Sequence, residues 1–385
     1  MASHVFYSTV KRFDTPFTSY IEGGLLLALK NYHLWILYGN GQWYLFDGVK
    51  NSVVNNGKIK GDINKYSHII KSPQILGDKL IAFANCGLTK LQVLDPYSGN
   101  LDEDWHLDTP TMECVPNNER TNEAKMTDAI NDINILVLQK SGRVCVCERR
   151  ETNTADYLVS VVEKGKKDKL QAVLGSQQKN YLFGKVNEED KVVLYSDYNS
   201  GEINFAIWDL SKHQDGFSSY NVGKNINTTV IYAGGWDTDS ICLFGNSDSS
   251  GIPEMYLADY AKKDVETQYL DYLGEDALLA DVIFADSRRK KVLCIEQGEE
   301  PILALYDGKN KKLDFKMNYE DPTNTFEVSV DKKYFVEYEG MMAGDTEEEK
   351  AGKTEVKIYS LVNKKMFLLY LMKKAVVNIQ NEKKS

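Results

Sequence analysis

One unit recurs along this 385-residue chain and constrains the fold more than any other feature. Its clearest copy runs from Glu202 to Val222. An apolar run that ends in Trp208-Asp209 is followed by a polar turn and by a second run that begins at Phe217. Apolar runs on both sides of a short polar break let two strands pair in register, so this unit predicts a β-hairpin.

The residue that closes the first strand of this hairpin has counterparts along the chain at intervals of 48, 53, 61, 50, 48 and 53 residues. A period of this size, with about four strands in each copy, is typical of a β-propeller, because no blade can bury both of its faces alone. We therefore predict an all-β fold, a seven-bladed β-propeller of four-stranded antiparallel blades, as a single domain over residues 1–385. The closing positions are Asp47, Asp95, Glu148, Asp209, Asp259, Asp307 and Ser360.

Strands can be assigned within each copy. The third copy is assigned Ile133 to Leu138, Val144 to Cys147 and Tyr157 to Val162, with Glu148 closing its third strand. In the fifth copy, Tyr269 to Tyr272 fills the fourth place. Second strands are sandwiched between neighbouring blades, so burial is predicted for Leu34, Ile36, Leu80, Ile135, Val137, Val192, Leu194, Ile241, Leu243, Val292 and Leu293.

The ends of the chain leave the closure of the ring open. The run Val5 to Val10 either completes the last blade or forms an extra edge strand beside Ala375 to Ile379, and Met366 to Leu371 is the predicted fourth strand of the last copy. Residues 340–353 form an acidic insert that is too polar to pack, so we expect it to protrude. Residues 381–385 are expected to be a short frayed tail.

At Trp208-Asp209 the chain resembles a WD40 repeat, whose third strand ends in this dipeptide. No copy carries the Gly-His pair that usually opens such a repeat, and the other copies have degenerate versions of the dipeptide: Phe46-Asp47, Leu94-Asp95, Cys147-Glu148, Ala258-Asp259, Tyr306-Asp307 and Tyr359-Ser360. The chain thus resembles a divergent WD40-like propeller. The resemblance implies a scaffold that binds other proteins on its faces and that lacks catalytic groups.

Composition restricts the classes of function. The formal net charge of -10 argues against a general affinity for nucleic acid, because attraction to phosphates needs positive potential. There is no signal-peptide pattern and no apolar run that approaches the ~20 residues of a membrane span. The six cysteines are scattered, as small core residues of a reducing compartment would be, so we expect an intracellular protein of the cytoplasm or nucleus.

Motifs for catalysis or metal binding are absent from the sequence. Cys145 and Cys147 share a face of one strand but have no matching Cys or His pair nearby, and zinc needs three or four convergent ligands. The loop from Asn246 to Gly251 imitates the start of a calcium loop, yet Leu257 stands where a bidentate Glu is required. We predict no cofactor and no metal. The alternative is a hydrolase or lactonase whose scattered residues meet in the central channel.

Turn charges are segregated between the two faces of the predicted ring. The turns between third and fourth strands share one face with the turns between first and second strands, and these turns are rich in lysine and arginine. The opposite face collects acidic turns and the insert, whose candidate interaction residues are Met341, Met342, Glu347, Glu348 and Glu349. The candidate basic interaction face comprises Arg149, Arg150, Lys262, Lys263, Arg288, Arg289, Lys290, Lys291, Lys309, Lys311, Lys312, Lys364 and Lys365.

Three hypotheses follow for the function. The first is a non-catalytic scaffold that joins a larger assembly through its two oppositely charged faces, with other proteins as partners. The second is the channel-site hydrolase or lactonase. The third is binding of RNA or phosphoinositide by the basic face, which would depend steeply on salt.

Overall fold

A computed structural model describes the parts of the chain on which the following account rests. Among the residues that it describes, nearly every element is a strand, and the helical elements are short 3-10 turns at Lys30–Tyr32 and Leu210–Lys212. The described residues are 13–14, 25–37, 41–59, 70–85, 90–102, 104–106, 133–150, 156–168, 170–174, 182–183, 190–198, 202–212, 216–222, 228–237, 240–247, 253–259, 262, 264–269, 278–286, 291–297, 302–307, 310, 312–318, 324–339 and 355–361.

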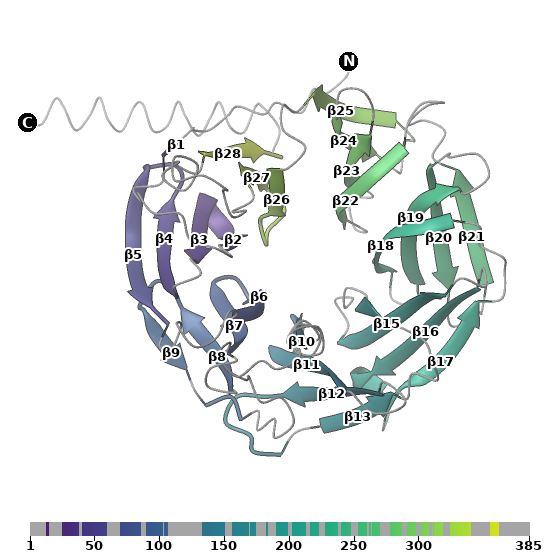
Figure 1. Ribbon diagram of the computed structural model, residues 1–385, viewed down its shortest axis with the longest axis horizontal. Coiled ribbons are helices and arrows are strands. Elements are labelled where there is room, and N and C mark those ends of the chain that lie inside the picture. The colour runs from purple at the N-terminus through teal and green to yellow at the C-terminus, as the bar shows by residue number, and fades with distance from the viewer. Residues whose placement is uncertain are drawn as a thin grey trace, which may run out of the picture.

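The strands form seven four-stranded antiparallel sheets within these residues, arranged as a ring of blades around a common centre (Figure 1). The innermost, first strands are β2 (Leu25–Ala28), β6 (Ile70–Leu76), β10 (Ile133–Leu138), β14 (Leu182–Phe183), β18 (Thr228–Asp237), β22 (Leu278–Asp286) and β26 (Asn324–Val328). The second strands are β3 (His33–Leu37), β7 (Leu80–Asn85), β11 (Arg143–Arg150), β15 (Lys191–Tyr198), β19 (Ser240–Ser247), β23 (Lys291–Gln297) and β27 (Tyr334–Glu339). The third strands are β4 (Gln42–Asp47), β8 (Lys90–Asp95), β12 (Asp156–Val162), β16 (Glu202–Asp209), β20 (Pro253–Asp259), β24 (Ile302–Asp307) and β28 (Glu355–Ser360). The outermost, fourth strands are β5 (Ser52–Lys58), β9 (Asn100–Asp102), β13 (Leu170–Leu174), β17 (Ser218–Val222), β21 (Asp264–Tyr269), β25 (Lys312–Asn318) and β1 (Phe13–Asp14).

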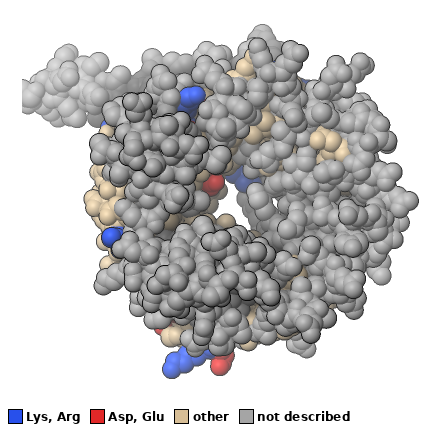
Figure 2. Space-filling model, viewed as in Figure 1, with Lys and Arg blue, Asp and Glu red and all other residues tan. Residues whose placement is uncertain are grey.

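The predicted β-propeller of four-stranded antiparallel blades is therefore confirmed. We number the blades 1 to 7 in the order of their first strands. In the space-filling view the ring surrounds a central opening, with acidic and basic side chains beside it (Figure 2). Such a ring lets each sheet bury both faces against its neighbours.

The last blade is completed by the start of the chain. Phe13 pairs with Val356 and Asp14 pairs with Glu355, so β1 takes the fourth place beside β28. The segments predicted to compete for this role, Val5 to Val10, Ala375 to Ile379 and Met366 to Leu371, lie outside the described residues. The ring is closed by this sheet, which joins the N-terminal strand β1 to the strands β26 to β28.

The strand assignment of the third copy was wrong. Val144 to Cys147, predicted to be the third strand, lies within the second strand, β11, and Glu148 is part of the same strand. The third strand is β12, which ends at Val162, and the fourth is β13. Residues 107–132 lengthen the chain between β9 and β10, so the even spacing that works for the other copies misplaced this one. In blade 5, similarly, the fourth strand is β21 and not Tyr269 to Tyr272.

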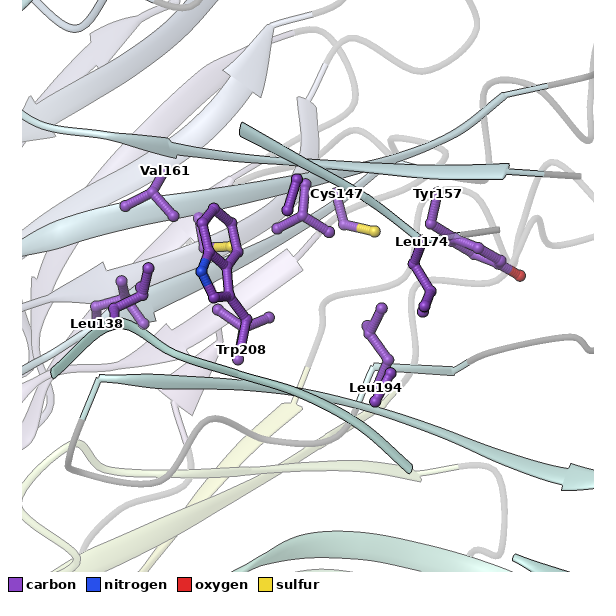
Figure 3. Close-up of a cluster of buried hydrophobic side chains, with 13 residues drawn as sticks. Leu138, Cys147, Tyr157, Val161, Leu174, Leu194 and Trp208 are labelled. Atoms are coloured by element: carbon purple, nitrogen blue, oxygen red, sulfur yellow. The ribbon is translucent and has the colours of Figure 1, made fainter. Parts of the chain in front are cut away.

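The apolar core lies between the blades. Figure 3 shows the cluster between blades 3 and 4, where Trp208 lies among Leu138, Val161 and Cys147. The prediction of buried second strands is confirmed for Leu34, Ile36, Val192, Leu194, Val292 and Leu293. Ile135 is also buried, but it lies on β10, which is a first strand and not the predicted second strand. Leu80 and Val137 are only partly buried, although both pack against a cluster between blades 2 and 3. The side chains of Ile241 and Leu243 lie outside the described set.

Candidate interaction surface

One face of the ring carries most of the described lysines in exposed turns. This face holds the turns between first and second strands and those between third and fourth strands, and we call it the lysine face. Its exposed lysines are Lys50, Lys79, Lys140, Lys164, Lys166, Lys167, Lys262, Lys312 and Lys333.

A repeated aspartate shapes the turns of this face. In blade 1, Oδ1 of Asp47 accepts hydrogen bonds of 2.9 Å from the backbone N–H groups of Val49 and Lys50. A carboxylate that accepts N–H groups two or three residues ahead holds the chain in a tight turn. The same arrangement recurs at Asp95, Asp209, Asp259 and Asp307, which accept from the N–H groups of Tyr97, Ser211, Lys262 and Asn310 at 2.9 to 3.0 Å.

A basic residue stands across the sheet from several of these aspartates. The first residue of the second strand pairs with the last residue of the third, which places His33 opposite Asp47 in blade 1 and Lys191 opposite Asp209 in blade 4. In blade 6 the register places Lys291, one of the predicted interaction residues, opposite Asp307. In blades 1 and 4 the side chains at this position lie beside the closing aspartate.

Between blades 1 and 2, the support is a chain of neutral and charged groups. Nδ1 of His33 lies 2.8 Å from the hydroxyl of Tyr97 in blade 2, and Nε2 lies 3.7 Å from Oδ2 of Asp47. Burial lowers the pKa of His33 below 6.5, and this outweighs the opposing effect of Asp47. Burial alone would raise the pKa of Asp47, but the N–H groups and ammonium of Lys50 lower it on balance. At neutral pH the histidine is therefore an uncharged link between two blades.

Between blades 3 and 4, the same place holds buried ions. Lys191 is only 2% exposed, and its Nζ lies 3.8 Å from Oδ2 of Asp209, which is also buried. Beside it, the buried Asp190 accepts from Arg143 of blade 3, with 3.4 Å between the guanidinium nitrogen and Oδ2. Charges removed from water need such partners. The pair of Lys191 and Asp209 lies within blade 4, whereas the pair of Arg143 and Asp190 joins blade 3 to blade 4.

Between blades 7 and 1, a tyrosine connects the turns of the two blades. The hydroxyl of Tyr334 donates toward the carbonyl oxygens of Leu29 and His33 in blade 1, the latter at 2.9 Å. Its ring stacks on Tyr32 with 4.7 Å between ring centroids. The junction where the ring closes is thus held by contacts of the same turns.

The exposed lysines of this face are largely matched by acids. Lys50 lies 3.2 Å from Asp47, and Lys262 lies 2.8 Å from Asp259. Further pairs join Lys79 to Asp95, Lys164 to Asp102, Lys166 to Glu163, Lys312 to Asp314 and Lys333 to Asp331 at 2.6 to 3.9 Å. Pairs at the surface add little stability, but they cancel the local positive potential. In the described part of the chain, the lysine face is a mosaic of both charges.

The structure moves two of the predicted interaction residues to the other face. Arg149 and Arg150 are the last residues of the second strand β11, so they lie at the end opposite to the lysine face and not in a turn between third and fourth strands. Lys262 and Lys312 are exposed on the lysine face, Lys262 in a turn and Lys312 at the start of β25. Lys263, Arg288, Arg289, Lys290, Lys309, Lys311, Lys364, Lys365 and the insert residues Met341, Met342, Glu347, Glu348 and Glu349 lie outside the described residues.

The place of Arg149 and Arg150 is taken by a turn that the sequence analysis missed. It joins β12 to β13 and carries Lys164, Lys166 and Lys167, all exposed. The apolar run of β12 followed by a Lys-Gly-Lys-Lys stretch was the available signal. It was passed over because the closing position had been placed one strand too early.

No group of three or more His, Cys, Asp or Glu side chains that could hold a metal ion occurs in the described part of the chain. Cys145, Cys147, Cys242 and Cys294 are buried free thiols, and burial raises the pKa of Cys145 far above its ordinary value. Such thiols behave as small core residues and not as nucleophiles. The described segments also include no helix long and apolar enough to cross a bilayer.

Comparison with known proteins bears on the fold. No family model matches the sequence, and no curated protein matches it. Among solved structures, the chain is similar to the β-propeller domain of Cps50 (Swd1) from Myceliophteria thermophila, with 10% sequence identity and a TM-score of 0.52. The match covers 91% of this chain and 100% of that one. The chain therefore has the fold of a WD40-like β-propeller.

Proposed function

We propose that this protein is a non-catalytic scaffold that binds other proteins on the faces of its ring as a subunit of a larger assembly. The observation that carries the proposal is that the polar side chains of the lysine face contact one another and the turns of the ring. His33 and Tyr97 join blades 1 and 2, and Lys191 and Asp209 support a turn of blade 4, so these side chains serve the ring itself and do not converge on a reaction centre. A rigid ring with shaped, mixed-charge turns is suited to recognition by complementarity.

Charge pairing on the lysine face favours protein partners over nucleic acid or phosphoinositide. A surface that binds phosphates needs lysines whose charge is uncompensated, and it loses affinity steeply as salt rises. Here the lysines of most turns have an acid within 4 Å, as given above. A protein surface that carries both signs of charge can match such a mosaic, whereas a uniformly anionic ligand would meet repulsion from the aspartates.

Co-purification from the native source tests the proposal. The tagged chain should recover stoichiometric protein partners at moderate salt, and a strictly solitary protein would overturn the scaffold. A Lys166→Glu/Lys167→Glu variant should lose a partner that uses the lysine face. The matched control is Lys58→Glu/Lys316→Glu, which makes the same charge change at exposed positions on the fourth strands β5 and β25.

The acidic insert is a second proposed contact, supported by its sequence alone. Met341 and Met342 would adapt to an irregular apolar surface, and the run from Glu347 to Glu349 would steer a basic partner. Replacing residues 341–351 by a short Gly-Ser turn should leave the melting temperature nearly unchanged, because the entropic cost of closing a surface loop depends only weakly on its length. Loss of one partner from the purified assembly is the expected result, and retention of every partner at native salt would leave the insert without this role.

A further inference from the structure

The fourth strands form the rim of the ring, and exposed strand edges pair with other chains unless they are blunted. Most rim strands show a recognisable defence. β1 and β9 have only two and three residues. β5 and β25 each pair with the third strand through a register shift, which is a bulge that twists the edge. β17 and β21 are composed mainly of polar residues.

β13 lacks these defences. Its five residues, Leu170–Leu174, include no charge and no proline, and its pairing with β12 runs without a register shift. Leu170 and Val173 are 53% and 57% exposed, the highest values for large apolar side chains in the described residues. A straight, uncharged and apolar edge is the kind that templates strand addition.

Val173 is exposed on the side of the sheet that faces blade 2. It pairs with Leu158 and lies on the same side of the sheet as Val162, which packs into the cluster between blades 2 and 3. The fourth strand of blade 2, β9, has only three residues. The side chain of Val173 is 57% exposed beyond that cluster.

The sequence of β13 also reads nearly the same in both directions. Ala172 is at the centre, Leu170 and Leu174 are at the two ends, and Gln171 and Val173 lie between them. In an antiparallel pair of such strands about Ala172, Leu170 of one copy lies opposite Leu174 of the other. Gln171 lies opposite Val173 in the same way. No charged group of the strand meets another, and most soluble oligomers use a self-complementary two-fold contact of this kind.

We infer that β13 pairs antiparallel with β13 of a second copy of this chain, so that two blades 3 form one continuous sheet across a two-fold axis at Ala172. This assigns a self-association surface at the rim, apart from the faces proposed for other proteins. The flanking sequence is compatible with it, since the charged run Lys166-Lys167-Asp168-Lys169 precedes the strand whereas Gly175-Ser176-Gln177 follows it without charge. Antiparallel pairing brings these two flanks together and keeps the lysines of the two copies apart.

Sedimentation equilibrium of the full chain tests this inference at protomer concentrations from about 1 to about 100 μM. The wild type should reach twice the monomer mass of 43.7 kDa. Val173→Lys and, separately, Leu170→Lys should raise the dimer Kd at least about tenfold, because the first places like charges near the axis and the second sets a charge against Leu174 of the other copy. Both side chains are more than half exposed, so the melting temperature of the monomer should be unchanged.

Leu313→Lys is the matched control, because Leu313 is 40% exposed on the bulged rim strand β25. It should leave the dimer intact. A Gln171→Cys/Val173→Cys double variant should form a covalent dimer on oxidation, since these two positions face each other across the axis. A monomer at all concentrations, a dimer that resists Val173→Lys, or binding of β13 to a different protein in place of a second copy would each overturn the inference. None of these results bears on the co-purification test of the scaffold.

Discussion

Blade 1 and blade 4 support the aspartate that closes the third strand with different chemistry. In both, the first residue of a second strand faces the aspartate that closes the third strand. Blade 1 uses the neutral His33, which reaches Tyr97 of the next blade, whereas blade 4 uses the charged and buried Lys191. The same register position thus recurs in both blades with different residues. How much each residue contributes to the free energy of unfolding depends on how deeply it is buried.

The largest expected effect on stability comes from removing the buried cation of blade 4. Lys191→Met leaves Asp209 buried without its cation, so the free energy of unfolding should fall by about 3 to 5 kcal/mol. Chemical denaturation at constant pH measures it. Lys50→Met is the control, because Lys50 pairs with the corresponding Asp47 but its side chain is 72% exposed, and it should cost less than about 1 kcal/mol. Equal losses in the two variants would show that burial does not separate them.

The next effect weakens the neutral junction. Tyr97→Phe removes the hydroxyl that lies 2.8 Å from Nδ1 of His33. Because the histidine is only partly buried and water can replace the lost partner, the expected loss is about 1 kcal/mol. The same substitution in a His33→Leu background should cost less, as a double-mutant cycle would show. A loss that is the same in both backgrounds would mean that the two side chains do not stabilise each other.

The smallest effect concerns pH. Burial holds the pKa of His33 below its ordinary value of 6.5, so the folded protein takes up this proton less readily than the unfolded chain. The stabilisation is therefore complete above pH 6.5 and is lost as the pH falls through the lowered pKa. The difference in unfolding free energy between wild type and His33→Gln should shrink from pH 7 to pH 5. A difference that stays constant over this range would contradict the assignment of His33 as a neutral link.

Much of the fold could be predicted because its cause is local. The period of about fifty residues, the continuous apolar second strands and the Asp-closed third strands all depend on neighbours in sequence. The one misplaced copy shows the limit of this reasoning. A short apolar strand looks the same in the second and third places, so spacing had to decide for Val144 to Cys147, and residues 107–132 make the spacing uneven.

The candidate surface was predicted only in part. Lysines in turns are visible in the sequence, and Lys262 and Lys312 lie on the lysine face. Their acidic partners were not foreseen, and neither was the exchange of Arg149 and Arg150 for the turn with Lys164, Lys166 and Lys167. Which face a turn occupies depends on the order of the strands within the sheet, and one error in that order moves every residue of the turn to the opposite face.

By itself, the sequence determined the recurrent unit and the turns that its aspartates close, since a carboxylate and the N–H groups two or three residues ahead are never far apart in the chain. Only the tertiary structure decided what meets those aspartates from across the sheet, and which rim strand stays bare. His33 and Asp47 are 14 residues apart, whereas Lys191 and Asp209 are 18 residues apart, and the register of two strands makes them equivalent. The exposure of Val173 was likewise not visible in the sequence, since an apolar residue of an outer strand is buried or exposed according to what packs beside its blade.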